Sequence, residues 1–362
     1  MESAILITGS SGYLGSALCV DLSRDHNVIG LYRRYPSKKL REAAPGVQWR
    51  KGDIVDRSCV DLAFERGAAN GFRIDYVIHL AAYTDFGEKW HDEYYDSNIL
   101  GTDNIIKIAS EAGVRRILFS GSVVAMPPLP DGNLLTEKSP ACGTTAYPLS
   151  KAMGEKLLKE NSNRVPIIVL RIGGVFTDWC ELPPLYSVMK LWSKPFIGRI
   201  MPGRGNSGFP YIHRKDLVGI VRKIVEKDAC LDRFETLFAS HEGCTYQKEL
   251  FPIIRKESNK RFCMKPLNVP PVLAKPVLHA KHVLNALIRK ETYERAWMID
   301  FVDRPFRVDT TYTREKLGWN PTPGLHILER LPVLMKNFTS HYRQWDIRNI
   351  RRNEQKYEYN PD

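Results

Sequence analysis

The sequence lacks long apolar runs, paired cysteines and clusters of metal-binding side chains. In its 362 residues no apolar stretch reaches the length that spans a membrane, and no signal-peptide pattern opens the chain. The seven cysteines are scattered, without a Cys-x-x-Cys pair or a His/Cys cluster. This pattern argues against a disulfide framework and against a metal centre. We therefore expect a cytoplasmic protein with reduced thiols and no metal site.

Positive charge is in excess, with a formal net charge of +12. The basic residues are dispersed and no nucleic-acid-binding module is recognisable, so we expect no nucleic-acid partner. The charge predicts attraction of an anionic cofactor, and it leaves open an anionic substrate or peripheral contact with a membrane surface. The length suggests two lobes or one large α/β unit.

A glycine-rich turn follows the first apolar run of the chain. Residues Ala4–Thr8 have strand length and composition, and an apolar helical pattern begins after Gly9, Gly12 and Gly15. A strand, a glycine turn and a helix N-terminus together form a cradle for a pyrophosphate, because the backbone can approach closely and donate N–H groups. The predicted cofactor-binding residues of this turn are Gly9, Ser11, Gly12, Tyr13, Leu14 and Gly15.

Strand and helix patterns alternate through the first half of the chain, which is typical of βαβ units and a parallel sheet. After Arg171 prolines interrupt short segments, which indicates an irregular substrate lobe. The expected strands are Ala4–Thr8, Asn27–Tyr32, Val47–Arg50, Tyr76–His79, Arg116–Ser120 and Ile167–Arg171, and the expected helices lie near 13–24, 56–67, 91–112, 146–161 and 216–226.

Tyr147 and Lys151 stand four residues apart at the start of an expected helix, so they share one helix face. A nearby cation favours the charged form of a phenol, which makes Tyr147 a usable proton donor or acceptor near neutral pH. Ser122 follows an expected strand at the sheet edge where α/β sites form. Its hydroxyl can bond a substrate oxygen, and Ser120 is the alternative for this role.

In family order these motifs resemble the extended short-chain dehydrogenases/reductases, which include sugar-nucleotide epimerases, 3β-hydroxysteroid dehydrogenases and dihydroflavonol-type reductases. The resemblance implies an α/β fold, a Rossmann doubly wound parallel sheet with a smaller C-terminal substrate-binding lobe. The matching runs are the glycine turn, Gly52-Asp53-Ile54, His79-Leu80-Ala81-Ala82, Asn98 with Gly101-Thr102, Ser120-Gly121-Ser122, and Tyr147 with Lys151.

The resemblance also implies roles. Asn98 would support a water and the backbone near the active site, and Asp53 would hydrogen-bond the adenine. Tyr147 would be the general acid/base, with Lys151 lowering its pKa and binding the nicotinamide ribose. Further residues expected along the cofactor are Ile54, Leu80, Ala81 and Ala82.

We expect a Rossmann domain at 1–172 with returning segments near 208–240, a substrate lobe at 173–207 and 241–345, and a loosely attached charged tail at 346–362. Lys316–Pro321 resembles the family's late segment, in which a small helix precedes an L-G-W-x-P turn. Asp216 is predicted to cap a helix, and His213 either orients the substrate lobe or simply packs. By resemblance, the helices near 91–112 and 146–161 would pair as a four-helix bundle in a homodimer.

The second expected strand ends in Arg33-Arg34 instead of the acidic residue that bonds the ribose hydroxyls of NAD. A guanidinium there would pair with a 2′-phosphate, so the sequence favours NADP(H) and leaves NAD(H) possible. The other interpretation is that Arg33 and Arg34 belong to a solvated basic loop.

Departures from the family pattern narrow the range of reactions and substrates that we expect. Ser122 is followed by Val123-Val124 instead of the Asp-Glu pair of sugar-nucleotide dehydratases, and Gly174 stands where many nucleotide-sugar enzymes carry Asn. Apolar residues between Trp179 and Phe196, and the stretch 270–287, could line a hydrophobic pocket or rest on a membrane.

The sequence therefore favours an NADP-dependent oxidoreductase that interconverts a carbonyl and a hydroxyl on a hydrophobic small molecule. An NAD-dependent sugar-nucleotide epimerase and a non-catalytic NADP-binding protein are the alternatives.

Overall fold

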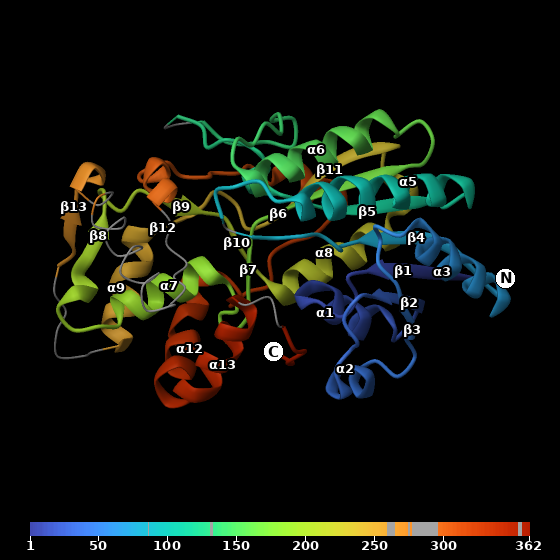
Figure 1. Cartoon of the computed structure of the whole chain (residues 1–362). Helices are drawn as coiled ribbons and strands as arrows, with labels where there is room; N and C mark the ends of the chain where they lie inside the picture. Colours follow the sequence, from blue (N-terminus) through green and yellow to red (C-terminus); the bar gives the residue numbers. More distant parts are fainter. Residues whose placement is uncertain (86, 131–132, 259–264, 274–275, 277–295, 354–356) are drawn as a thin grey trace.

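A seven-stranded parallel sheet forms the centre of the computed structural model, which describes residues 1–85, 87–130, 133–258, 265–273, 276, 296–353 and 357–362. The sheet contains β1 (Glu2–Thr8), β2 (Asn27–Tyr32), β3 (Gln48–Lys51), β4 (Phe72–His79), β5 (Arg116–Ser122), β6 (Ile167–Ile172) and β11 (Phe234–Ala239). Their order is β11-β6-β5-β4-β1-β2-β3, so the chain winds outward from β1 in both directions (Figure 1). This confirms the doubly wound Rossmann sheet.

Helices cover both faces of this sheet because the strands are apolar on both sides. Ile5 and Ile7 of β1 belong to one core cluster, and Ala4 and Leu6 belong to the other, as the alternation of side chains along a strand requires. The first cluster packs against α1 (Tyr13–Leu22) and α8 (Arg214–Glu226), and the second against α3 (Arg57–Ala69), α5 (Gly101–Glu111) and α6 (Ala146–Glu160).

Two expected helix features differ in the structure. The helix expected at 91–112 is α4 (Asp92–Tyr95), a π-helical turn (Asp96–Leu100) and then α5, and Asn98 lies in the π-helical turn. Asp216 does not cap α8, because His213 occupies the cap position and its Nδ1 accepts the N–H of Lys215 at 3.3 Å. The Asp216 carboxylate instead accepts hydrogen bonds from the backbone N–H and hydroxyl of Thr322.

A second lobe packs at one end of the sheet around its own apolar cluster, with Trp192 and Trp345 fully buried in it. The segment 311–317 forms a small helix that ends at Gly318 with φ +56°, as the resemblance implied. The predicted lobe boundaries remain a proposal. The remaining elements are α2 (Lys38–Ala43), α7 (Pro183–Trp192), α9 (Gln247–Ser258), α11 (Thr311–Leu317), α12 (Ile327–Ser340), α13 (Tyr342–Asn353), β7 (Gly174–Phe176), β8 (Ile200–Pro202), β9 (Gly208–Phe209), β10 (Tyr211–His213), β12 (Thr245–Tyr246) and β13 (Leu267–Val269).

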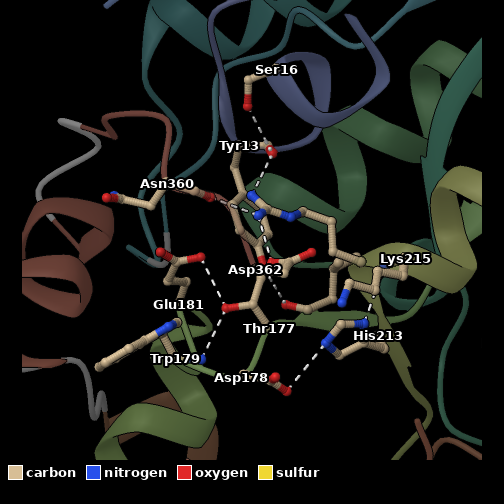
Figure 2. Close-up of polar contacts among 12 residues, drawn as sticks. Tyr13, Ser16, Thr177, Asp178, Trp179, Glu181, His213, Lys215, Asn360 and Asp362 are labelled. Carbon is tan, nitrogen blue, oxygen red and sulfur yellow. Dashed lines mark hydrogen bonds and ion pairs between the residues drawn. The ribbon is translucent and has the colours of Figure 1, made fainter. Parts of the chain in front are cut away.

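The expected loose attachment of the C-terminal tail is wrong. Trp345 and Arg348 of α13 are buried, and Arg348 donates to Glu181 at 2.7 Å. Further along, Asn360 and Asp362 lie beside Tyr13 (Figure 2), where the Arg214 guanidinium binds the backbone oxygens of Tyr13 and Asn360 and the carboxylate of Asp362. Arg348 and Asp362 of this tail are therefore paired with the rest of the fold.

The Arg214 guanidinium also donates to the hydroxyl of Tyr357 at 2.8 Å, and the rings of Tyr357 and Tyr13 meet edge to face. Of the apolar stretch 270–287, only 270–273 and 276 fall within the described residues. None of the described helices is both long and apolar enough to cross a membrane.

Replacing Trp345 tests whether α13 belongs to the core of the second lobe. Trp345→Ala should lower the free energy of unfolding by about 3–5 kcal/mol, because it leaves a cavity in a packed cluster. Tyr342→Ala, in the same helix but 51% exposed, is the matched control and should cost less than about 1 kcal/mol. Urea unfolding measures both, and equal effects would mean that α13 does not stabilise the core.

Candidate active site

One cavity of about 1060 Å³ opens at the carboxyl ends of β1, β2, β4, β5 and β6 and continues into the second lobe. Ser122, Tyr147 and Lys151 line it, whereas Asn98 does not. The cofactor-binding residues predicted from the sequence also line it: Gly9, Ser11, Gly12, Tyr13, Leu14, Gly15, Arg33, Arg34, Asp53, Ile54, Leu80, Ala81 and Ala82.

The glycine turn has the shape of a pyrophosphate cradle. Gly9 has φ +66°, and a Cβ there would lie 2.9 Å from the backbone nitrogen of Ala81. A Cβ on Gly15 would overlap the carbonyl oxygen of Gly9, so α1 can begin this close to the turn only with glycine. No side chain caps the first turn of α1. The turn therefore fits the diphosphate of a dinucleotide.

A buried hydrogen-bond network supports the far wall of this cradle. The Thr8 hydroxyl oxygen accepts the N–H groups of Leu80 and Ala81, each at 3.1 Å. His79 bonds Thr8 through Nδ1 at 2.8 Å and Thr102 through Nε2 at 3.1 Å, and burial lowers the pKa of His79 to about 3. Sequence reasoning missed the role of Thr8, because it depends on a contact across 71 residues.

The two candidate serines at the end of β5 have different surroundings. The Ser120 hydroxyl donates to the carbonyl oxygen of His79 at 3.1 Å, so it is already engaged in the fold. Within the described residues, no hydrogen bond engages the Ser122 hydroxyl, and Ser122 lines the cavity. This geometry supports Ser122 over Ser120 as the hydroxyl available to a ligand.

Lys151 is a buried part of the cavity wall and is held by the sheet. Its Nζ donates to the carbonyl oxygen of Ser120 at 2.8 Å. Burial lowers the pKa of Lys151 to about 8, and the Glu155 carboxylate opposes this change. Glu155 in turn pairs with Arg171 at 2.9 Å, with both side chains almost fully buried. Sequence reasoning missed Glu155, although its position one helical turn after Lys151 was a usable signal.

Asn98 is connected to the backbone of Tyr147 through the Ser150 hydroxyl. Its side-chain oxygen accepts the N–H of Tyr83 at 2.7 Å, and its amide nitrogen donates to the Tyr83 carbonyl oxygen and to the Ser150 hydroxyl. The Ser150 hydroxyl donates to the backbone oxygen of Tyr147 at 2.8 Å. Asn98 thus acts on backbone and helix position, and its catalytic role stays a prediction.

The arginines after β2 lie at the rim of the cavity. Arg33 is exposed, and its guanidinium lies 3.6 Å from the Asp53 carboxylate. Asp53 also accepts the N–H of Val55, which makes a local turn. The Ser11 hydroxyl donates to the backbone oxygen of Arg34 at 2.7 Å, so this loop is tied to the glycine turn.

The far part of the cavity is mostly apolar. Of the apolar residues singled out between Trp179 and Phe196, those lining it are Leu182, Leu191 and Trp192, whereas Leu185, Tyr186 and Met189 pack in the lobe core and Phe196 is exposed. Sequence reasoning missed much of this wall, because its residues come from separate short segments. The residues missed are Val188, Phe209, Tyr211, Leu250, Met298, Phe301, Arg304 and Phe306.

Comparison with known proteins finds sequence relatives over part of the chain. The UDP-glucose 4-epimerase of Yersinia enterocolitica is 36% identical over 169 residues, which are 44% of this chain and 48% of that protein. The Bacillus subtilis UDP-glucose 4-epimerase is 30% identical over 43% of this chain and 47% of its own length. The chain thus spans about half the length of these relatives.

Solved structures match almost the whole fold. The UDP-glucose 4-epimerase of Thermotoga maritima, solved with UDP-glucose, gives a TM-score of 0.69 at 19% identity, covering 94% of this chain and 99% of that one. The dTDP-glucose 4,6-dehydratase of Bacillus anthracis, solved with NAD, gives 0.70 at 14% identity over 95% and 99%.

The model of the NAD dependent epimerase/dehydratase family matches residues 5–235. These residues carry the glycine turn and the Ser122, Tyr147 and Lys151 positions. The chain belongs to the NAD-dependent epimerase/dehydratase family, within the extended short-chain dehydrogenases/reductases.

Proposed function

We propose that this protein is a nicotinamide-dependent enzyme that moves a hydride at a carbon bearing a hydroxyl or carbonyl group. The observation that carries the proposal is that Ser122, Tyr147 and Lys151 line the same cavity as the glycine turn. A dinucleotide bound on that turn would supply the hydride acceptor or donor. The chain's own residues would bind the reacting oxygen and move its proton.

In this mechanism Tyr147 exchanges a proton with the reacting oxygen through its phenol. The Ser122 hydroxyl donates a hydrogen bond to the same oxygen and stabilises the charge that develops there. The ammonium of Lys151, held on the Ser120 carbonyl, favours the ionised form of the phenol. Asn98 holds the start of α6 through Ser150, and so keeps Tyr147 at the cavity.

We propose a sugar nucleotide as the substrate and epimerisation as the reaction. The sequence relatives are UDP-glucose 4-epimerases, and one structural neighbour was solved with UDP-glucose. These comparisons support the epimerase alternative better than the hydrophobic substrate first expected. In an epimerase Tyr147 would take the hydroxyl proton as the hydride leaves the carbon. After the intermediate ketone has rotated in the site, the hydride would return to its opposite face and Tyr147 would return the proton, so no net oxidation occurs. Arg304 is exposed at the far part of the cavity, and it is a candidate to bind the diphosphate of the sugar nucleotide.

Net oxidation or reduction of a hydrophobic molecule is the second candidate. It is favoured by the apolar lining of the far cavity, with Leu191, Trp192 and Phe301 among its residues. Incubating the protein with UDP-glucose, or with a panel of ketones and NAD(P)H, distinguishes epimerisation from net oxidation or reduction. Epimerisation leaves the cofactor unchanged overall, whereas the second candidate consumes it in proportion to product. Dinucleotide binding without any turnover would favour the non-catalytic alternative.

The comparisons favour NAD(H), since several neighbours were solved with NAD. Arg33 and Arg34 keep NADP(H) as the alternative, because guanidinium groups at this position can pair with a 2′-phosphate. The homodimer through α4, α5 and α6 and the cytoplasmic location stay predictions.

Removing the phenol hydroxyl tests the mechanism. Tyr147→Phe should lower turnover by about 10²–10⁴-fold, because the proton transfer is lost, while dinucleotide affinity stays nearly constant. Ser122→Ala should lower turnover by a smaller factor. Ser120→Ala is its matched control and should have less effect, since that hydroxyl is engaged with His79. A Tyr147→Phe protein with most of its activity would exclude Tyr147 as the proton donor.

The pH dependence of stability tests the burial of Lys151. Its folded-state pKa of about 8 lies below the ordinary 10.5. Between these values the unfolded chain binds more protons here than the folded chain, so the free energy of unfolding rises with pH. Relative to Lys151→Met, the wild type should therefore gain up to about 3 kcal/mol between about pH 7 and about pH 11. Urea unfolding without cofactor measures this, and a difference constant with pH would contradict the lowered pKa.

Charge reversal at the rim tests the cofactor contact. Arg33→Asp should weaken NADPH binding by about tenfold or more, because a charge-assisted hydrogen bond is lost and an anion is introduced. NADH binding should change less or improve. Arg164→Asp, at an exposed position outside the cavity lining, is the matched control. Fluorescence titration with both dinucleotides measures the affinities. Unchanged NADPH affinity would show that Arg33 does not bind the 2′-phosphate. If the wild type binds NADH more tightly than NADPH, the cofactor is NAD(H).

A further inference from the structure

Two chain segments lie side by side at the end of the second lobe far from the Rossmann sheet. They are 193–200, which leads into β8, and 265–273, which contains β13 (Figure 1). The strands β8 and β13 pair in parallel, and Arg199 Nε donates to the carbonyl oxygen of Lys265 at 3.1 Å. We call the surface formed by 193–200 and 265–273 the lobe tip.

Large apolar side chains gather on the lobe tip and face solvent. Phe196 and Val272 are each 81% exposed, and Leu273 is 61% exposed. Ile197 and Leu267 are each 54% exposed. Single exposed apolar residues are ordinary on a protein surface, but five of this size in two adjacent short segments mark an interaction site.

Buried contacts hold the base of this tip in place. The guanidinium of Arg255, which is 1% exposed, donates to the carbonyl oxygens of Trp192 and Lys194 at 2.8 and 2.6 Å, and to that of Pro195 at 3.3 Å. The Trp192 indole N–H donates to the carbonyl oxygen of Ile200, which closes the loop. Phe196 and Ile197 are therefore presented outward by a fixed loop, and they do not fold back into the lobe core.

The charge of the lobe tip has one sign. Its two segments carry Lys194, Arg199 and Lys265 and contain no Asp or Glu. A surface that combines exposed apolar side chains with cations matches the interface of an anionic bilayer, where apolar groups enter the acyl boundary and cations meet the head groups. A surface of neutral lipid would satisfy only the apolar part.

We propose that the lobe tip docks on the surface of an anionic lipid bilayer. Phe196 and Val272 enter the acyl boundary, while Lys194 and Lys265 contact the phosphates of the head groups. Trp192 and Pro202, at the two ends of the loop that bears Phe196, line the far part of the cavity, so the docked tip adjoins its apolar end. This proposal is independent of the reaction that the site performs.

Cosedimentation of the full chain with vesicles tests the docking. Vesicles of phosphatidylcholine and phosphatidylglycerol in equal parts should bind the protein, and vesicles of phosphatidylcholine alone should bind it more weakly. Phe196→Ser should weaken binding by about tenfold or more, because a phenyl group no longer leaves water. Leu62→Ser is the matched control, since Leu62 is 40% exposed on α3 at the other end of the molecule, and binding should stay unchanged.

Charge reversal tests the contribution of the cations to vesicle binding. Lys194→Glu should weaken binding to the anionic vesicles by about fivefold or more, and added salt should weaken wild-type binding. Lys159→Glu, exposed at the end of α6, is its control. Thermal unfolding should be the same for all four variants, because each changed side chain is exposed.

Three results would overturn the proposal. The first is that wild type does not bind anionic vesicles at low salt. The second is that Phe196→Ser binds them as tightly as wild type does. The third is concentration-dependent self-association of the wild type, abolished by Phe196→Ser and without vesicle binding, which would assign the lobe tip to a second copy of this chain.

Discussion

The buried ammonium of Lys151 is the constraint on which the rest of the site depends. Removing such a charge from water costs several kcal/mol, so the fold must provide partners for it. The carbonyl oxygen of Ser120 accepts a hydrogen bond from the ammonium, and the Glu155 carboxylate lies one helical turn away. Glu155 is held by Arg171, whose guanidinium also binds the backbone oxygens of Glu137 and Ser139. One charge thereby ties β5, α6, β6 and the loop before α6 together.

The same network continues to the cofactor side of the cavity. Ser120, whose carbonyl holds Lys151, donates its hydroxyl to the backbone of His79. His79 bonds Thr8, and Thr8 holds the backbone of Leu80 and Ala81 against the glycine turn. Buried hydrogen bonds of this kind are expensive to leave unmade, so they fix the distance between the two walls. The position proposed for the proton donor and the position proposed for the dinucleotide are therefore parts of one rigid unit.

Local patterns in the sequence were sufficient for the parts of the site that are local in the chain. The glycine turn and the four-residue spacing of Tyr147 and Lys151 each lie within one strand–helix unit, and both line the cavity. The parallel sheet also follows from the alternation of strands and helices. The structure confirms the sheet and brings the glycine turn, Tyr147 and Lys151 to one cavity, because short-range spacing and the surrounding fold point in the same direction.

Features that depend on distant contacts were not predictable in this way. The bond from Thr322 to Asp216 spans 106 residues, and the contact of Arg214 with Tyr357 spans 143. Their charge and their lack of apolar periodicity made the last residues resemble a loose tail, although the ring of Tyr357 packs against the ring of Tyr13. In α7 both faces are apolar, so periodicity could not separate Leu185 and Met189 in the core from Val188 and Leu191 in the cavity.

Hydride transfer through a bound dinucleotide, with Tyr147 moving only the hydroxyl proton, can be tested by running the reaction in heavy water. The protein is incubated with UDP-glucose and NAD, and the sugar is analysed for deuterium at the epimerised carbon. Hydride transfer within the closed site predicts an epimerised product without deuterium at that carbon, because the hydrogen returns from the cofactor. Deuterium at that carbon would show that it is deprotonated and reprotonated from solvent, which would contradict the proposed chemistry.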